Sequence, residues 1–451
     1  MSIKEIINDA LITYDHTHGL IYLVKTGDFI SCSPHHAKTL ESITEKYKNK
    51  TLSAIESRKL EAYYQSIIKR PLRDCKEPTG LNARNILEKV EFIISTTCNL
   101  NCLYCYADAG TYGYKKLVMT PEQIKLYIDA IIEAGYTTIN TLMFFGGEPC
   151  LGKKTIIQCC KYIYKLYNLK KLKILPRITL VTNGTLLDTE MINAIKHYNI
   201  LTTISLDGPK EIHNRLRPFY NGGGTYDHII NSIQEMNNMG CKPNLIEATY
   251  TKVHQDEGFT KETLKEFLIN VSGSDKILIE NCTGEKNKNI CPDTSDSETK
   301  KSLVYDIHFI AGLGSKAFSG ISCGAGLSSF AVLPDGALYP YHFFISHLEY
   351  QCGSIHDGKI VFSNYKSVKE KLLALSKLKN NDCISCWRKS ICINCPATRL
   401  LGEDNRKNSC TYKHIYNEND MLNFLRIKLD TNRWQKIQTQ LKQLHRESCV
   451  L

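Results

Sequence analysis

The sequence lacks any apolar run long enough to cross a membrane, and its N-terminus lacks the apolar core of a secretory signal peptide. It also lacks a long basic arm, because the lysines behind its net charge of +11 are spread through predicted helices. Basic patches interleaved with aromatic residues, which are typical of nucleic-acid-binding proteins, are missing as well. We therefore expect a cytoplasmic protein with neither a membrane nor a nucleic-acid partner.

Cysteine, by contrast, is abundant: the 451 residues include 19 cysteines. A chain of this length is expected to form two or three domains. Several of the cysteines cluster at short spacings, which in a cytosolic protein favours metal binding over disulfide bonds.

The first cluster follows an apolar segment, Phe92–Ile94, that is predicted to be a buried strand. Cys98, Cys102 and Cys105 have the spacing CxxxCxxC, so one loop can turn all three thiolates toward one point. Thiolates suit zinc or iron–sulfur clusters, but structural zinc usually takes four protein ligands. Three cysteines without a neighbouring fourth ligand favour a [4Fe–4S] cluster with one open iron over three buried, unliganded thiols.

Strands and helices are predicted to alternate from residue 90 to about residue 281. This pattern is typical of a parallel α/β sheet, whose ligands bind beyond the carboxyl ends of the strands. The six expected strands are Phe92–Ser95, Thr141–Phe145, Ile178–Thr182, Thr202–Leu206, Asn244–Tyr250 and Lys276–Glu280.

Four short motifs fall at or after the ends of these strands. They read Gly-Gly-Glu-Pro from Gly146, Thr-Asn-Gly around Asn183, Ser-Leu-Asp-Gly-Pro from Ser205, and His-Asn-Arg-Leu-Arg ending at Arg217. Each alone would be an ordinary turn or helix cap. Together with the cysteine loop, their order resembles the radical S-adenosylmethionine (SAM) superfamily.

The resemblance implies a partial (β/α)6 barrel in which SAM chelates the open iron and is cleaved to a 5′-deoxyadenosyl radical. It implies that Glu148 binds the SAM amino group and that Arg217 pairs with the SAM carboxylate. The full set of residues to which it gives a cofactor-binding role is Tyr104, Gly146, Gly147, Glu148, Pro149, Asn183, Ser205, Asp207 and Arg217.

A second cysteine array lies near the C-terminus, in a region with too few apolar runs to form its own core without metal. Its order resembles the SPASM domain, which carries two auxiliary [4Fe–4S] clusters, although zinc would also suit its two CxxC pairs. The resemblance assigns Cys383, Cys386, Cys392 and Cys410 to an outer cluster, and Cys323 and Cys395 to an inner one.

The array departs from the family pattern in two ways. Cys392 and Cys395 are one residue closer than usual, and Tyr341 stands where the family usually has a cysteine. The inner cluster is therefore absent, degenerate or completed by another ligand. Cys352 is the first candidate for that ligand, ahead of His342 and Tyr341, and the alternative for Cys352 is a small buried apolar residue.

The N-terminal region reads as a hairpin, with strands near residues 20–24 and 29–30, followed by helices from Pro34 and from Leu52 to Ile68. This α+β module resembles the winged-helix leader-recognition domain of peptide-modifying radical SAM enzymes; a plain N-terminal cap on the barrel is the alternative. A basic helix from Met421 to His445 is expected to be a solvated surface helix. The expected domains are 1–80 (leader recognition and linker), 81–281 (barrel), 282–322 (bridge), 323–412 (SPASM-type) and 413–451 (C-terminal helix).

The segment after the cluster loop, Ala107 to Gly113, resembles enzymes that form thioether crosslinks in ribosomal peptides. We therefore expect a radical SAM oxidoreductase that modifies a precursor peptide bound through its leader, with a flavodoxin or ferredoxin as electron donor. The alternatives are a carbon–carbon crosslinking maturase, a formylglycine-generating enzyme like the anaerobic sulfatase maturases, and a metal-bearing RNA-binding protein. The catalytic residues are not predicted.

Overall fold

A computed structural model describes residues 3–72, 74–76, 80–81, 85–282, 289–292, 317–321, 323–384, 386–392, 395–401, 418–430 and 435. The chain divides into two compact units. The barrel unit comprises Thr79–Ser302 and Gly324–Lys371, and the flanking unit comprises Met1–Pro78, Leu303–Cys323 and Leu372–Leu451. No helix in the described ranges combines the length and apolar character needed to span a membrane. Cys410 lies outside the described residues, as does most of the predicted bridge.

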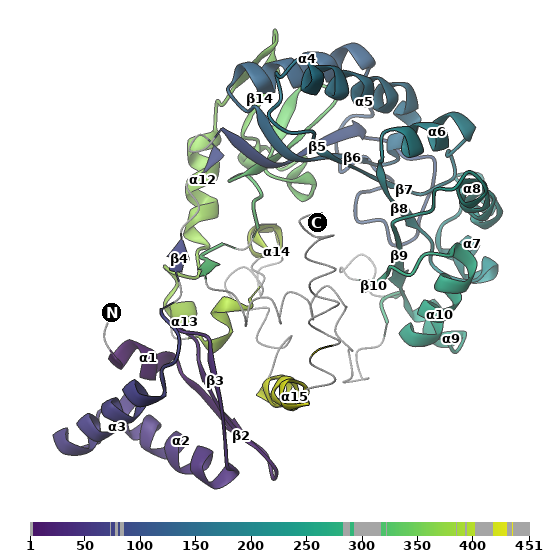
Figure 1. The fold of residues 1–451 in the computed structure, drawn as a ribbon. Coiled ribbons are helices and arrows are strands. Elements are labelled where there is room, and N and C mark those ends of the chain that lie inside the picture. The colour runs from purple at the N-terminus through teal and green to yellow at the C-terminus, as the bar shows by residue number, and fades with distance from the viewer. Residues whose placement is uncertain are drawn as a thin grey trace. The chain divides into compact units, whose positions relative to one another are not determined.

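The barrel unit is built on six parallel strands that neighbour one another in chain order. These are β5 (Ile86–Ser95), β6 (Thr138–Gly146), β7 (Arg177–Thr182), β8 (Leu201–Ser205), β9 (Leu245–Tyr250) and β10 (Ile277–Asn281). The six predicted strands and their parallel order are thereby confirmed. Figure 1 shows this curved sheet with helices along its outer side.

The connecting helices begin where the sequence offers caps. They are α4 (Pro121–Glu133), α5 (Lys153–Asn168), α6 (Thr189–His197), α7 (Lys210–Leu216), α8 (Tyr226–Asn238), α9 (Lys252–Asp256) and α10 (Lys261–Ser272). The predicted N-cap of α4 is confirmed: Thr120 accepts a hydrogen bond from the Gln123 amide, and the Gln123 side chain accepts one from the Thr120 amide. Such a capping box satisfies two backbone donors that a helix start leaves unpaired.

Four further strands extend the same sheet beyond β5. β12 (Ser329–Val332) pairs with β5 in parallel, and β13 (Ala337–Tyr339), β14 (Gly353–His356) and β15 (Lys359–Val361) follow antiparallel. The sequence did not predict that the region after Cys323 begins by joining the barrel sheet. This joining brings the short helical turn η4 (His342–Phe344), just after β13, to the barrel's cavity. A second turn, η5 (Leu348–Tyr350), precedes β14, and α12 (Tyr365–Ala374) follows β15.

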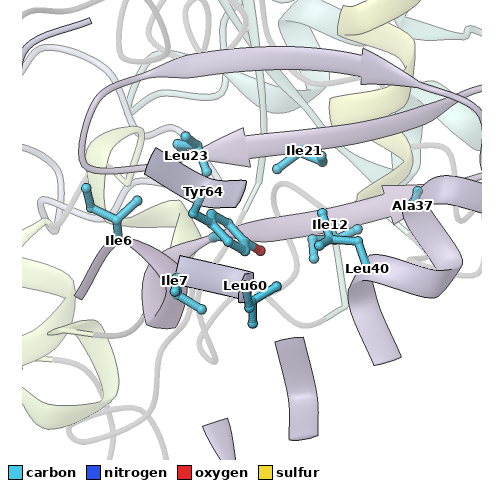
Figure 2. Packing of buried hydrophobic residues seen from close by; sticks show 10 residues of the cluster. Ile6, Ile7, Ile12, Ile21, Leu23, Ala37, Leu40, Leu60 and Tyr64 are labelled. Carbon is cyan, nitrogen blue, oxygen red and sulfur yellow. The ribbon is translucent and has the colours of Figure 1, made fainter. Parts of the chain in front are cut away.

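The flanking unit begins with the predicted α+β module. Its elements are α1 (Ile3–Asp9), β1 (Leu11–Tyr14), β2 (Gly19–Leu23), β3 (Asp28–Cys32), α2 (Pro34–Lys48) and α3 (Ala54–Ile67), of which α1 and β1 were not predicted. The three strands form an antiparallel sheet in which β3 is an edge. Figure 2 shows Leu23 of the sheet, Ile7 of α1 and Tyr64 of α3 in the module's apolar core.

The other face of this module shares a second core with the C-terminal region. Tyr22 packs with Ile391 and with Met421 and Phe424 of α15 (Glu418–Leu429), and its hydroxyl lies 3.0 Å from Ser390 Oγ. The C-terminal helix was expected to be a solvated surface helix, and α15 differs in that its apolar face is buried in this core. The remaining elements of the unit are β4 (Asp74–Lys76), its parallel partner β11 (Ala317–Ser319), α13 (Asn381–Ile384), η6 (Trp387–Ser390) and α14 (Pro396–Leu401).

Candidate active site

A cavity of about 530 Å³ lies at the carboxyl ends of the barrel strands, and Cys98, Cys102 and Cys105 line one wall of it. Two backbone hydrogen bonds hold the cysteine loop against the C-terminal end of α7 and the residues just after it. The Asn101 amide donates to Pro218 O, and the Leu103 amide donates to Leu216 O. Burial raises the pKa of the Cys98 thiol to about 12 and that of Cys102 to about 11. Bound metal would reverse this effect by holding the sulfurs as thiolates.

The donor set fits an iron–sulfur cluster better than a single ion. In the part of the chain that the structure describes, no three Cys, His, Asp or Glu side chains converge closely enough to hold one metal ion. A zinc ion would draw its ligands to about 2.3 Å, whereas a four-iron cluster is wider and takes sulfurs that stand further apart. Three thiols in one cavity wall, with open space beside them, match the wider group.

The two glycines of the Gly-Gly-Glu-Pro motif let a second loop pack directly on the cysteine loop. The Gly147 amide donates to Ser95 O at 2.8 Å, and a Cβ on Gly147 would lie 2.3 Å from Thr97 O. Gly146 has φ +134°, and a Cβ there would lie 2.2 Å from Ser95 O. Both glycines line the cavity, and neither has room for a side chain.

Glu148 lies behind the cavity instead of in its wall. Its carboxylate is fully buried and accepts hydrogen bonds from the Cys150 amide, the Thr182 hydroxyl and the Asn183 amide. Burial raises the pKa of Glu148, and these hydrogen bonds oppose that shift. In this arrangement Glu148 ties the Gly-Gly loop to the end of β7, and Pro149, which starts the turn η2 (Pro149–Gly152), is buried beside it.

Asn183 and Ser205, from the ends of β7 and β8, both line the cavity. The Asn183 side-chain amide donates to Asn99 Oδ1 at 2.9 Å and lies 3.8 Å from Cys98 Sγ. It therefore joins the third strand to the cysteine loop.

Tyr104, Asp207 and Arg217 form one hydrogen-bonded chain. The Tyr104 hydroxyl donates to Asp207 Oδ2 at 2.5 Å and accepts from Arg217 Nη1 at 2.6 Å. Asp207 is fully buried, whereas Tyr104 and Arg217 line the cavity. Arg217 Nε is buried and has no hydrogen-bond partner among the described residues. The guanidinium thus keeps one unpaired N–H donor, and Arg217 lines the cavity, which suits a carboxylate ligand.

Two buried histidines hold this chain in place. The His213 Nδ1 accepts from the Asp207 amide, and its Nε2 lies 3.1 Å from the Thr225 hydroxyl, which donates to Arg217 O. Burial lowers the pKa of His213 to about 4, so the ring is neutral near pH 7. His254 Nε2 lies 2.6 Å from Asp207 O. The His-Asn-Arg-Leu-Arg motif therefore supports the site from behind.

One wall of the cavity is aromatic and was not predicted. Tyr106, Phe145, Tyr341, His342 and Phe343 line it. The imidazole of His342 stacks on Phe145 with ring centroids 4.3 Å apart, and Glu91 of β5 binds it from behind. Glu91 directly precedes the apolar run Phe92–Ile94 in β5, and nothing in the sequence distinguishes it from Glu88 of the same strand.

Polar residues of β9 and β10, also missed by sequence reasoning, close the third side. Glu247, Glu280, Asn281 and Cys282 line the cavity there. Burial raises the pKa of Glu247, although Arg217 opposes the shift. Cys282 has a second thiol nearby, with Cys291 Sγ 3.7 Å from its sulfur.

The C-terminal cysteines belong to the flanking unit. Burial lowers the pKa of Lys377. The sulfurs of three of these cysteines, Cys383, Cys386 and Cys392, oppose that shift. Lys377 Nζ also donates to Cys392 O at 2.9 Å. Cys323 and Cys395 are partly buried in the same unit. Cys352 belongs to the barrel unit, where it is fully buried and its thiol lies 3.8 Å from Tyr350 O.

Comparison with known proteins matches residues 92–267 to the radical SAM superfamily. A cysteine-type anaerobic sulfatase-maturating enzyme of Clostridium perfringens is 24% identical over 354 residues, which cover 72% of this chain and 92% of that protein. The radical SAM cyclopropyl synthase TigE of Paramaledivibacter caminithermalis is 31% identical over 163 residues, 33% of this chain and 32% of that protein. The solved structure of native anSMEcpe with bound AdoMet has the same fold, with 20% identity and a TM-score of 0.55 over 70% of this chain and 92% of that one.

Proposed function

We propose that this chain is a radical SAM enzyme that modifies a ribosomally made precursor peptide by joining a cysteine sulfur to a carbon of a second residue. The observation that carries the proposal is the cavity: the cluster loop and Arg217 line one part of it, and an aromatic wall lines another. One side suits SAM, and the other is a desolvated surface for a peptide side chain.

Each side of the cavity has a distinct role in this proposal. Cys98, Cys102 and Cys105 hold the [4Fe–4S] cluster, and Arg217 binds the SAM carboxylate, with Tyr104 and Asp207 fixing the guanidinium. Gly146, Gly147, Asn183 and Ser205 line the same cavity and would contact bound SAM. Bound together, the cluster and SAM supply a 5′-deoxyadenosyl radical that removes a hydrogen atom from the peptide. The aromatic wall excludes water from that step.

The N-terminal module is the proposed docking site for the peptide's leader. Its sheet ends in β3, which pairs with β2 on one side, and the structure places no strand on the other side within the described ranges. An extended peptide can add to such an edge through backbone hydrogen bonds. The module's separate core supports this role, because it gives the edge strand a rigid base.

The C-terminal cysteines are the proposed ligands of auxiliary iron–sulfur clusters. The buried Lys377 ammonium beside Cys383, Cys386 and Cys392 supports a negatively charged group at that place. The auxiliary cluster would accept the electron left after carbon–sulfur bond formation, and a flavodoxin or ferredoxin would supply the electron that cleaves SAM. Thiolate-bound clusters require a reducing compartment, which favours the cytoplasm.

A second candidate function is oxidation of a cysteine to formylglycine. It is favoured by the sulfatase-maturating relative, which aligns over 92% of its own length. The two functions predict different products, since a thioether retains the sulfur and formylglycine loses it.

Co-expression tests the choice between them. A short cysteine-containing peptide encoded beside this gene would be co-expressed anaerobically with the enzyme or with its Cys98→Ala variant, and then weighed. We expect the loss of two hydrogens per modified cysteine, resistance to alkylation, and no change with the variant. Exchange of sulfur for oxygen together with the loss of two hydrogens would instead establish formylglycine formation, and an unchanged peptide would reject both assignments for that substrate.

A further inference from the structure

A buried carboxylate–imidazole pair supports the aromatic wall of the cavity. His342 Nδ1 lies 3.0 Å from Glu91 Oε1, and the His342 amide donates to Glu91 Oε2 at 3.1 Å. Glu91 is 1% exposed and His342 is 3% exposed. One carboxylate oxygen of Glu91 thus holds the imidazole of His342, and the other holds the backbone amide of the same residue.

Glu91 stays ionised in this position. Burial raises its pKa, but His342 and the nearby Lys89 ammonium outweigh burial, and the net shift is downward. An ionised carboxylate accepts hydrogen bonds and donates none, so the proton of the pair lies on His342 Nδ1. In the tautomer that this hydrogen bond selects, the lone pair of the ring is on Nε2.

The free nitrogen of His342 belongs to the cavity. Among the described residues, no group forms a hydrogen bond with His342 Nε2. This nitrogen is also not completely buried. Since His342 lines the cavity, Nε2 is open to whatever enters it. Stacking on Phe145 and contact with Tyr341, whose ring centroid lies 3.8 Å away, fix the plane of the ring.

We propose that His342 is the base that takes the proton from the substrate's cysteine thiol, and that Glu91 is the residue that positions it. This inference rests on the proposed function, because it needs a substrate thiol. In the step, the S–H bond breaks, its proton passes to His342 Nε2, and its electron pair stays on sulfur as the thiolate. The imidazolium beside Glu91 then releases the proton to solvent, so no net charge or electron is consumed.

The other titratable groups of the cavity are less suited to this step. Burial raises the pKa values of Tyr106 and Tyr112 above their usual range, so both stay protonated. Glu247 lies on β9, six strand positions away from β13 in the sheet order, and Arg217 on the SAM side opposes the rise in its pKa. Lys89 lies 4.6 Å above the Tyr341 ring and is a cation. Within the aromatic wall, as far as the structure describes it, His342 is the residue that offers an oriented lone pair.

Chemical rescue of a His342→Ala variant tests the proposal with the peptide that co-expression finds to be modified. We expect crosslink formation to fall about 100-fold or more, the usual contribution of a general base. Cleavage of SAM to 5′-deoxyadenosine should continue, because the cluster loop and Arg217 are untouched. Added imidazole should restore crosslinking, and substituted imidazoles should do so in order of their basicity.

Matched controls separate a base from a side chain that merely fills space. Pyrazole has the shape of imidazole but is a far weaker base, and it should not rescue. Glu91→Gln keeps the size and removes the charge, and it should lower kcat while leaving KM unchanged. His347→Ala removes an exposed histidine that pairs with exposed Glu349, and it should have no effect.

Each remaining outcome has one meaning. If His342→Ala forms the crosslink as fast as the wild-type enzyme, or if pyrazole rescues the variant as well as imidazole does, His342 is not the base. The proposed function would remain intact in either case. Failure of the wild-type enzyme to modify any cysteine peptide would reject the proposed function, and this inference would fall with it.

Discussion

Gly147 shows how tightly single residues constrain this site. Its missing Cβ would meet the backbone oxygen of Thr97 at 2.3 Å, and neither backbone segment can move without shifting the cysteine loop. The sequence predicted a close approach of this loop to a ligand. The structure adds that the closest approach is to the cluster loop itself, which spacing alone does not reveal.

Gly147→Ala should therefore disable the cluster site. We expect loss of most of the iron bound by the barrel unit and at least a tenfold weaker binding of SAM, measured by iron analysis and equilibrium dialysis. Gly222→Ala is the matched control, because its Cβ would enter open space and only its φ of +79° is strained, at a cost of about 1 kcal/mol. Normal iron content in Gly147→Ala would contradict the close packing.

Buried His213 should make stability depend on pH. Its pKa is lowered to about 4 by burial, whereas the unfolded chain has the ordinary value of about 6.5. Between these values the unfolded state binds more protons, so the free energy of unfolding should fall by up to about 1.4 kcal/mol per unit as pH decreases from 6.5. Above pH 6.5 this effect is absent.

The His213→Gln variant isolates that contribution. Urea unfolding at pH 7 and pH 5.5 should show a smaller loss of stability on acidification in the variant than in the wild type, by about 1 kcal/mol. Acid also affects the clusters, but it does so equally in the wild type and the variant. That effect therefore cancels when the two losses in the free energy of unfolding are subtracted. Equal losses would mean that His213 is protonated at little cost.

Among the elements, the cysteine-rich stretch is organised around a buried lysine. Lys377 is 2% exposed and lies beside Cys383, Cys386 and Cys392. If these sulfurs hold an auxiliary cluster, the ammonium stabilises its more negative, reduced form.

Lys377→Met should therefore lower the reduction potential of that cluster. We expect a shift of about 60 mV, equivalent to a tenfold change in a one-electron equilibrium constant. A redox titration followed by electron paramagnetic resonance would measure it. The exposed neighbour Lys379 provides the control, and an unchanged potential in Lys377→Met would show that the lysine faces no cluster.

The N-terminal module has two apolar cores with separate consequences. Leu60 belongs to the core within the module, whereas Phe424 of α15 belongs to the core shared with Tyr22 and Ile391. Leu60→Ala and Phe424→Ala should each cost about 2–5 kcal/mol. Only Phe424→Ala should also reduce the iron content assigned to the C-terminal cysteines, because Ile391 is adjacent to Cys392. Equal iron content in the two variants would contradict this coupling.

For the molecule as a whole, the barrel was the most predictable part. Its six strands are short apolar runs, and their connecting helices carry caps, so local pattern and tertiary structure agree. The cysteine loop, Asn183, Ser205 and Arg217 were predicted to gather because parallel strands end at one edge. The hydrophobic periodicity therefore predicted the barrel strands. The parallel topology predicted which of these side chains would meet at the cavity.

The rest depended on contacts between distant segments. Glu91 and His342 are 251 residues apart and meet because β12 pairs with β5. Glu148 was predicted to face SAM, but its carboxylate is taken up by Thr182 and Asn183. The local sequence around a residue does not show which distant residue its side chain will contact. The ligands of the auxiliary clusters stay a prediction, as do the domain boundaries.

The most direct test of the central claim follows a hydrogen atom. A precursor peptide would be labelled with deuterium on its carbon-bound positions and incubated anaerobically with reconstituted enzyme, SAM and a reductant, and the 5′-deoxyadenosine would be weighed. The account predicts that deuterium moves from the peptide into 5′-deoxyadenosine, and that Cys98→Ala forms none. Formation of 5′-deoxyadenosine without deuterium, together with an unmodified peptide, would contradict the claim that this cavity acts on that peptide.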